Sequence, residues 1–188
     1  MDNGSESTAK RINKVRRIVR YSVAVTASVL LIIVCIVGVN FYRLSSDRLF
    51  AEKYSVYELT TARIENDSTE SKIIKAYREK KYSEVININK NSMLSVKDIF
   101  LTGMSYLETN DLSKAISSYQ VVIADVKDGK SIQLKDTAEY YLALAYLKNN
   151  DYDQAIELMN TIHDNSSHQY KSKFSRNYIN KVKRLKWR

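Results

Sequence analysis

Two stretches of this chain repeat each other at an interval of 40 residues, and this repeat limits the possible folds more than any other feature. In each copy a polar Asn-Asp pair separates two apolar stretches, which predicts a helix, a tight turn and a second helix. One such unit exposes an apolar face that only a stacked neighbour can bury, so the sequence predicts an all-α solenoid. The matched pairs are Gly103 with Ala143, Tyr106 with Tyr146, Asn110 with Asn150, Asp111 with Asp151, Ala115 with Ala155 and Ile116 with Ile156.

Each first helix carries a small residue followed three positions later by a tyrosine, and each second helix carries an alanine, Ala115 or Ala155. Small side chains let the two helices approach closely while the ring fills the space beside them. The pattern resembles the tetratricopeptide repeat (TPR) family, most clearly in residues 142–146 and 150–156. The resemblance implies antiparallel helix pairs and a concave groove, lined by the first helices, that binds a protein or a peptide.

A weaker third copy lies upstream, and its register around Tyr77 is displaced by one residue. With it, the repeats form three helix pairs at about residues 69–95, 96–127 and 133–164. Apolar residues at helical spacing from Gln169 to Trp187 predict a last helix that caps the open end of the stack. The residues that keep the helix-turn-helix outline of the third copy are Ile73, Ala76, Tyr77, Tyr82, Val85 and Ile86.

Residues 21–42 contain no charged side chain. As a helix, these 22 residues would extend about 33 Å, which matches the hydrocarbon core of a bilayer. Six basic residues precede the run and three occur in the twenty residues after it, which places the N-terminus in the cytoplasm and the repeats outside. The run is long for a signal peptide and lacks a cleavage motif, so we expect an uncleaved anchor in the inner membrane and a periplasmic C-terminal domain.

The formal net charge of +9 is concentrated at the two ends of the chain. Residues 41–168 carry 16 basic and 19 acidic side chains, whereas residues 169–188 carry eight basic side chains and none that is acidic. This last group is either a solvated face of the capping helix or an anion-binding patch for lipid head groups or an acidic partner. Nucleic acid is not expected as a partner outside the cytoplasm. The patch would comprise Lys171, Lys173, Arg176, Lys181, Lys183, Arg184, Lys186 and Arg188.

The sequence contains no phosphate-binding loop, nucleophile elbow or other motif of enzymatic chemistry. Its single cysteine, Cys35, lies inside the apolar run, which argues against a disulfide framework or a thiolate metal site. His163 and His168 are five residues apart, which is the wrong spacing for two ligands on one helix face, and we expect both at the surface. We therefore predict no enzyme and no metal, cofactor or small-molecule site.

Six apolar residues occupy the positions that line the concave groove in the TPR family. They form three pairs with members 40 residues apart, one from each first helix. An open groove of this composition would bind the apolar side of a helix or an extended peptide. Alternatively, the aromatic segment with Phe50, Tyr54 and Tyr57 fills the groove from within the chain, and the sequence leaves both alternatives open. The six residues are Phe100, Met104, Leu107, Tyr140, Leu144 and Leu147.

The predicted parts of the chain are a basic cytoplasmic tail (1–20), a transmembrane anchor (21–42), a juxtamembrane helix and connector (43–67), the repeats (68–168) and a basic capping helix (169–188). This order resembles small membrane-anchored TPR proteins of Bacteroidetes-type bacteria. The resemblance implies an extracytoplasmic scaffold that binds another envelope protein or peptide through its groove. The alternative is a signalling component whose cytoplasmic tail contacts a regulator such as a sigma factor. The short tail favours the scaffold.

A reporter enzyme that is active only in the cytoplasm tests the predicted orientation. Fused after Arg188, the reporter should remain inactive in cells, because the charge asymmetry places this end of the chain across the membrane. The same reporter fused before Met1 should be active and serves as the control. Strong activity of the fusion after Arg188 would contradict the predicted orientation.

Overall fold

The structure, a computed structural model, describes residues 29–36, 38, 44–59, 72–89, 94–125 and 132–187. The chain divides into two compact units, Met1–Leu44 and Ser45–Arg188. In the first unit, residues 29–36 and 38 are helical and their large apolar side chains are exposed, up to 68% at Val34. No helix among the described residues combines the length and the apolar character needed to cross a membrane. The predicted basic tail (1–20), the remainder of the predicted span (21–42) and residues 60–67 of the predicted connector lie outside the described residues.

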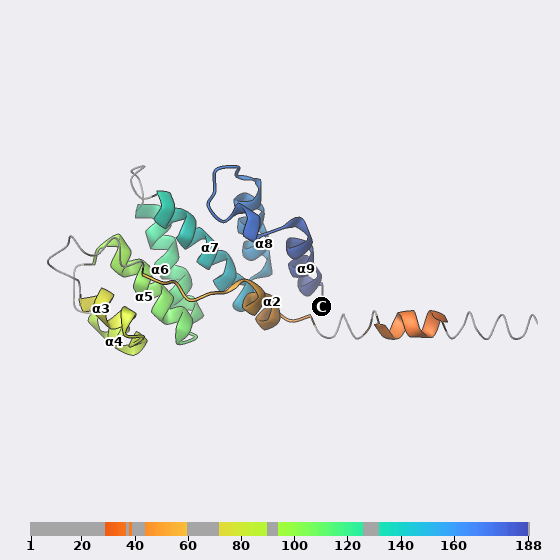
Figure 1. Ribbon diagram of the computed structural model, residues 1–188, viewed down its shortest axis with the longest axis horizontal. Coiled ribbons are helices and arrows are strands. Elements are labelled where there is room, and N and C mark those ends of the chain that lie inside the picture. The colour runs from red at the N-terminus through yellow and green to blue at the C-terminus, as the bar shows by residue number, and fades with distance from the viewer. Residues whose placement is uncertain are drawn as a thin grey trace, which may run out of the picture. The chain divides into compact units, whose positions relative to one another are not determined.

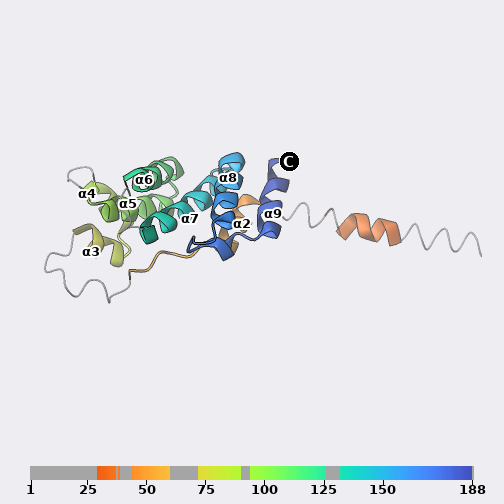
Figure 2. The same cartoon turned by 90° about the horizontal axis from the view of Figure 1, so that it is seen from above.

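The regular secondary structure described in the second unit is entirely helical. Three antiparallel helix pairs follow one another along the chain, and a helix from each end of the unit joins them. Figures 1 and 2 show the pairs in sequence order, from α3 and α4 at one end of the unit to α8 and α9 at the other. The helices are α2 (Ser46–Lys53), α3 (Lys72–Arg78), α4 (Tyr82–Asn89), α5 (Val96–Glu108), α6 (Leu112–Asp125), α7 (Ile132–Lys148), α8 (Tyr152–Asp164) and α9 (Arg176–Lys186).

The turn inside each helix pair has the same backbone conformation. Lys80, Asn110 and Asn150 have φ angles of 57°, 63° and 65°, in the left-handed region that ends many helices. The next amide N–H then donates to the carbonyl five residues earlier, as from Lys81 to Ala76 at 2.9 Å. Asparagine tolerates this conformation better than most residues, which explains the Asn at two of the three turns. The common turn aligns the upstream pair with the other two and places Ala76 where they have a tyrosine.

Small residues allow the two helices of a pair to pack closely. A Cβ atom added to Gly103 on α5 would lie 3.0 Å from the Cβ atom of Ser118 and 3.0 Å from the ring of Tyr119, both on α6. Ala115 and Ala155 on the second helices have no exposed surface. The small residues of the repeat therefore mark the closest approach between helices, as their pattern predicts.

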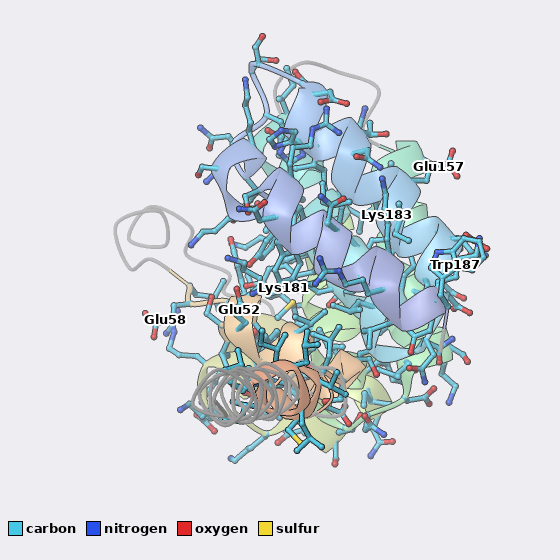
Figure 3. The ribbon with its side chains drawn as sticks, turned by 90° about the vertical axis from the view of Figure 1, so that its right-hand side faces the viewer. Glu52, Glu58, Glu157, Lys181, Lys183 and Trp187 are labelled. Atoms are coloured by element: carbon cyan, nitrogen blue, oxygen red, sulfur yellow. The ribbon has the colours of Figure 1, made fainter. Side chains whose placement is uncertain are left out.

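The last helix is shorter than the sequence predicts. The expected helix from Gln169 to Trp187 is interrupted, because residues 171–173 form a 3₁₀ turn and α9 begins only at Arg176. The hydroxyl of Ser175 accepts a hydrogen bond from the Tyr178 amide and so caps the helix at this point. α9 still covers the end of the stack, and its inner side is buried against α8 and α2. Figure 3 looks onto this end of the molecule.

Replacing Ala155 by leucine tests the helix packing. The larger side chain should overpack α8 against α7 and lower the free energy of unfolding by about 1–3 kcal/mol. Gln154→Leu, at the adjacent exposed position on the same helix, is the matched control and should have little effect. Thermal melting of both variants measures the difference. Equal melting temperatures for Ala155→Leu and the unmodified protein would mean that this position does not lie at a close helix contact.

Candidate functional site

The groove between the first helices is filled by the chain itself. All six residues predicted to line it are buried, with at most 2% of their surface exposed. Residues 49–59, which we call the groove segment, comprise the end of α2 and an extended stretch. Figures 1 and 2 show this segment running from α2 along the side of α7 and α5 toward α3. Of the two alternatives that the sequence leaves open, the structure shows the filled groove, so the open groove is absent here. Partner binding at the six positions stays a prediction.

Hydrogen bonds from tyrosine hydroxyl groups hold the backbone of the groove segment. Three hydroxyl groups, two from α7 and one from α3, donate to carbonyl oxygens of the segment. The accepting residues are the last residue of α2 and two residues of the extended stretch after it, and the latter lie two positions apart, as expected when one edge of an extended backbone faces a groove. These hydrogen bonds recognise the backbone of a peptide and do not depend on its side chains. The donor and acceptor pairs are Tyr140 with Lys53 (2.6 Å), Tyr141 with Ser55 (2.8 Å) and Tyr77 with Tyr57 (3.0 Å).

Aromatic side chains of the groove segment pack against the floor of the groove. The ring of Tyr57 meets the ring of Phe100 edge to face, with 4.9 Å between centroids. Tyr54 stacks on Phe50 of α2 at 4.6 Å and approaches Tyr141 edge to face at 6.1 Å. Such pairs add about 0.5–1.5 kcal/mol each beyond the area that they bury. Tyr54 and Tyr57 therefore contact residues of the groove directly, and Phe50 stacks on Tyr54 from α2.

The groove tyrosines are held in their neutral form. Burial raises the pKa of Tyr140 to about 12, and it raises the pKa of Tyr77 and Tyr141 further, because a buried phenolate would lose its hydration. The Tyr54 hydroxyl, which donates to the carboxylate of Glu108, has its pKa raised by burial and then by that carboxylate. At neutral pH these hydroxyl groups are therefore all available as donors.

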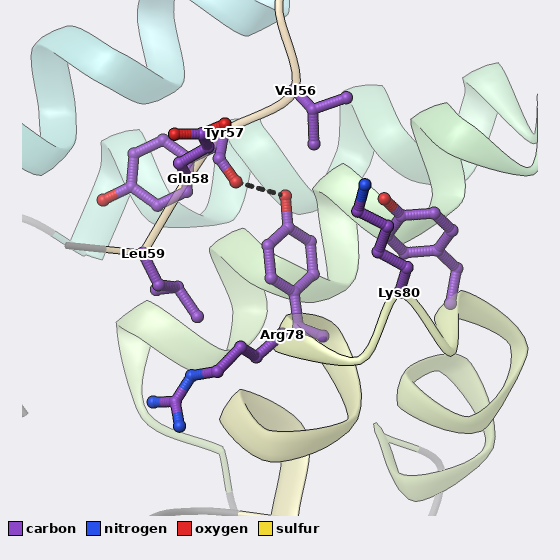
Figure 4. Close-up of a pocket in the computed structure, with 8 residues that line it drawn as sticks. Val56, Tyr57, Glu58, Leu59, Arg78 and Lys80 are labelled. Atoms are coloured by element: carbon purple, nitrogen blue, oxygen red, sulfur yellow. Dashed lines mark hydrogen bonds between the residues drawn. The ribbon is translucent and has the colours of Figure 1, made fainter. Parts of the chain in front are cut away.

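A cavity of about 270 Å³ lies where the groove segment reaches the first repeat. Figure 4 shows the Tyr77 hydroxyl donating to the Tyr57 carbonyl at this cavity, with the side chains of Arg78 and Lys80 beside it. Residues 56–59 form one wall, and the α3–α4 turn with Tyr82 forms the opposite wall. The cavity leaves space for a further side chain next to the extended backbone. Sequence reasoning missed it because it depends on how the segment ends against the first repeat.

The structure corrects the prediction that both histidines lie at the surface. His163 is half-buried and His168 is buried, with 5% of its surface exposed. The Nε2 atom of His168 lies 3.1 Å from a carboxylate oxygen of Glu139 and 3.7 Å from one of Asp136. The ligand atoms of these three residues lie within 4.8 Å of one another, which is close enough to hold a metal ion. Only the i, i+3 spacing of the two carboxylates on α7 was visible in the sequence.

The hydrogen bonds of this cluster indicate a structural role. The Nδ1 atom of His168 accepts the Tyr170 amide N–H at 3.0 Å, so the neutral ring carries its proton on Nε2 and donates it toward Glu139. A metal ion on Nε2 would need that nitrogen without its proton while Nδ1 still accepts. Asp136 in turn accepts the Gln169 amide N–H at 2.8 Å. The cluster therefore fastens the loop before α9 to α7.

Basic residues of the last segment divide into two groups. Three form ion pairs with other helices, namely Arg176 with Asp164 (2.5 Å), Lys181 with Glu52 (3.2 Å) and Lys186 with Asp153 (2.5 Å). The second group is exposed and makes no ion pair with the described part of the chain; it comprises Lys171, Lys173, Lys183 and Arg184. Arg188 lies outside the described residues. Of the eight cations in the predicted anion patch, four are therefore exposed and outside any ion pair with the described residues.

Comparison with known families supports the repeat pattern. The family model described as a tetratricopeptide repeat-like domain matches residues 19–175, which is most of the chain. No match was found among curated proteins or among solved structures. This match agrees with the helix pairs, their common turns and the close helix contacts, which all indicate the same repeats.

Raising the pH tests the buried tyrosines. An unfolded chain loses tyrosine protons near pH 10, whereas folded Tyr140 keeps its proton to about pH 12. Unfolding therefore releases protons in this window, and the stability that is fully present below pH 10 should fall as the pH rises through it. Circular dichroism melting of the full chain in detergent measures this fall, and Tyr140→Phe should make it shallower. A melting temperature that stays constant over this range would contradict the assignment.

Proposed function

Since the chain belongs to the tetratricopeptide repeat-like family, we propose that it is a membrane-anchored protein-interaction scaffold whose peptide groove is occupied by its own groove segment. The observation that carries this proposal is the capture of every second backbone carbonyl from Lys53 to Tyr57 by tyrosine hydroxyl groups. A groove that holds this stretch as an extended peptide has the chemistry to hold a similar peptide of an envelope protein. The partner is therefore a protein with an exposed, aromatic, extended segment.

The membrane anchor is the second part of the proposal. It is supported by the uncharged run of residues 21–42 and by the basic residues before it. The described helical residues of this run expose half or more of their large apolar side chains, which favours an apolar environment around them. In the inner membrane this orientation directs the repeats to the periplasm. The signalling alternative rests on the tail of residues 1–20, and the orientation of the anchor already explains the positive charge of that tail.

The occupied groove controls access of a partner. Because the groove segment belongs to the same chain, it competes with an effective concentration in the millimolar range, about that of a short tether. A partner must therefore displace the segment, and its apparent dissociation constant rises in inverse proportion to the fraction of molecules in which the groove is open. A partner therefore binds only when its affinity and concentration are high enough to displace the segment.

A peptide that copies residues 48–59 tests the proposed function. Tyr57→Ala removes the edge-to-face contact with Phe100 and should release the segment, so the labelled peptide should bind this variant about tenfold more tightly than the unmodified chain, for a loss of about 1.4 kcal/mol. Tyr57→Phe keeps the ring and is the matched control. Fluorescence anisotropy with the full chain in detergent measures the binding. Equal affinity for Tyr57→Ala and Tyr57→Phe would contradict an occupied peptide groove.

A further inference from the structure

The outward face of α9 combines positive charge with an exposed indole. Lys183 and Arg184 follow Asn180 by three and four residues, and Trp187 follows them by four and three, so the four residues share one side of the helix. All four are exposed, and Trp187 has 86% of its surface exposed. Tryptophan is usually covered in folded proteins, which makes such an exposed ring informative. Figure 3 shows Lys183 and Trp187 on the side of the unit that carries α9.

Neighbouring acidic residues leave the charge of this face uncompensated. Three carboxylates near α9 are already paired, Asp164 with Arg176, Glu52 with Lys181 and Asp153 with Lys186. α9 itself contains no acidic residue. Lys183 and Arg184 make no ion pair with the described residues, so both remain available to an anionic partner.

The start of the second unit and the end of α9 are attached to the same turn. The Ser46 hydroxyl donates to the side-chain carbonyl of Asn150 at 2.8 Å, and the Lys186 ammonium group donates to Asp153 at 2.5 Å. Asn150 and Asp153 are three residues apart, at the junction of α7 and α8. Ser46 follows the end of the predicted span at Tyr42 by four residues, a stretch of chain that reaches at most about 14 Å. An anchor that ends at Tyr42 would therefore hold Ser46 within this distance of the end of the span.

Direct contacts between α2 and α9 fix this arrangement. The Tyr178 hydroxyl donates to the Leu49 carbonyl at 2.7 Å, and the Lys53 ammonium group lies 5.0 Å from the centre of the Tyr178 ring. Figures 1 and 2 both show α2 and α9 at the same end of the repeats. α9 therefore packs beside α2, which is the helix of this unit that follows the predicted anchor in the sequence.

We propose that the outward face of α9 docks on the anionic phospholipid surface of the membrane that anchors the chain. Trp187 lies in the head-group region, where the amphipathic indole is stabilised, and Lys183 and Arg184 lie against lipid phosphates. This inference rests on the proposed membrane anchor, which supplies the high local concentration of lipid that so small a surface needs. An acidic protein would suit the cations, but the tether to the membrane and the exposed indole both favour lipid.

The single tryptophan of the chain makes this contact directly measurable. The full chain is reconstituted into vesicles of phosphatidylcholine alone and into vesicles that also contain phosphatidylglycerol. In the anionic vesicles the Trp187 emission should shift to shorter wavelength and acrylamide should quench it less. High salt should reverse both changes, because it screens the charges. Equal lipid composition in the two leaflets makes the result independent of the direction of insertion.

Charge reversal provides the matched variants. The double variant Lys183→Glu, Arg184→Glu should abolish the emission shift in anionic vesicles. The control Lys171→Glu, Lys173→Glu changes the charge by the same amount at the other end of α9 and should retain the shift. A shift that survives in the first variant would overturn the role of these two cations.

Flotation of the vesicles separates failure of the anchor from failure of the docking. The chain should float with neutral vesicles even in high salt, because the anchor is apolar. Failure to float there overturns the anchor and this inference with it. Flotation with both kinds of vesicle but identical Trp187 emission overturns the docking alone, and it assigns the α9 face to an acidic protein partner.

Discussion

The hydrogen bonds between groove tyrosines and the groove segment are the contacts on which the rest of the structure depends. Without the segment, three hydroxyl groups would exchange their backbone acceptors for water, at a net cost of about 0.5–1.5 kcal/mol for each hydrogen bond. The apolar floor with Phe100, Met104 and Leu144 would face water at the same time. The segment therefore covers the concave face that the first helices of a solenoid otherwise leave available for binding. The chain's own segment thus contributes to the stability of the repeats.

The groove segment and α2 connect the two ends of the second unit. α2 carries Leu49 and Phe50 into the core, and its first residues follow the apolar run directly. The junction of α7 and α8 receives both Ser46 and Lys186, so the start and the end of the second unit meet at one place. A partner that pulls the groove segment out of its groove would also loosen the contact of α2 with α9. Release of the groove segment and the packing of α9 are thus physically coupled.

Local signals in the sequence predicted the repeats well. Small residues, the Asn-Asp turns and the apolar periodicity depend on contacts within one helix pair, and the structure and the family match confirm the all-α repeat fold. The one-residue displacement around Tyr77 is explained by the common turn at Lys80, since Ala76 takes the place of the tyrosine.

Long-range contacts set the limit of these predictions. Apolar residues at the groove positions form the same pattern whether the groove is open or filled, so only the structure distinguishes the two cases. The burial of His168 depends on carboxylates about thirty residues away, and the short α9 depends on the cap at Ser175. Neither of these features leaves a periodic signal in the sequence.

The contact between the rings of Tyr57 and Phe100 is the most direct test of the occupied groove. Nuclear Overhauser effects between selectively labelled tyrosine and phenylalanine rings measure it in the full chain in detergent micelles. The 4.9 Å separation of the centroids predicts a strong cross-peak between these two rings, which should persist when labelled protein is diluted with unlabelled protein. Absence of the cross-peak, with Tyr57 resonances at the positions of a solvent-exposed tyrosine, would contradict the account.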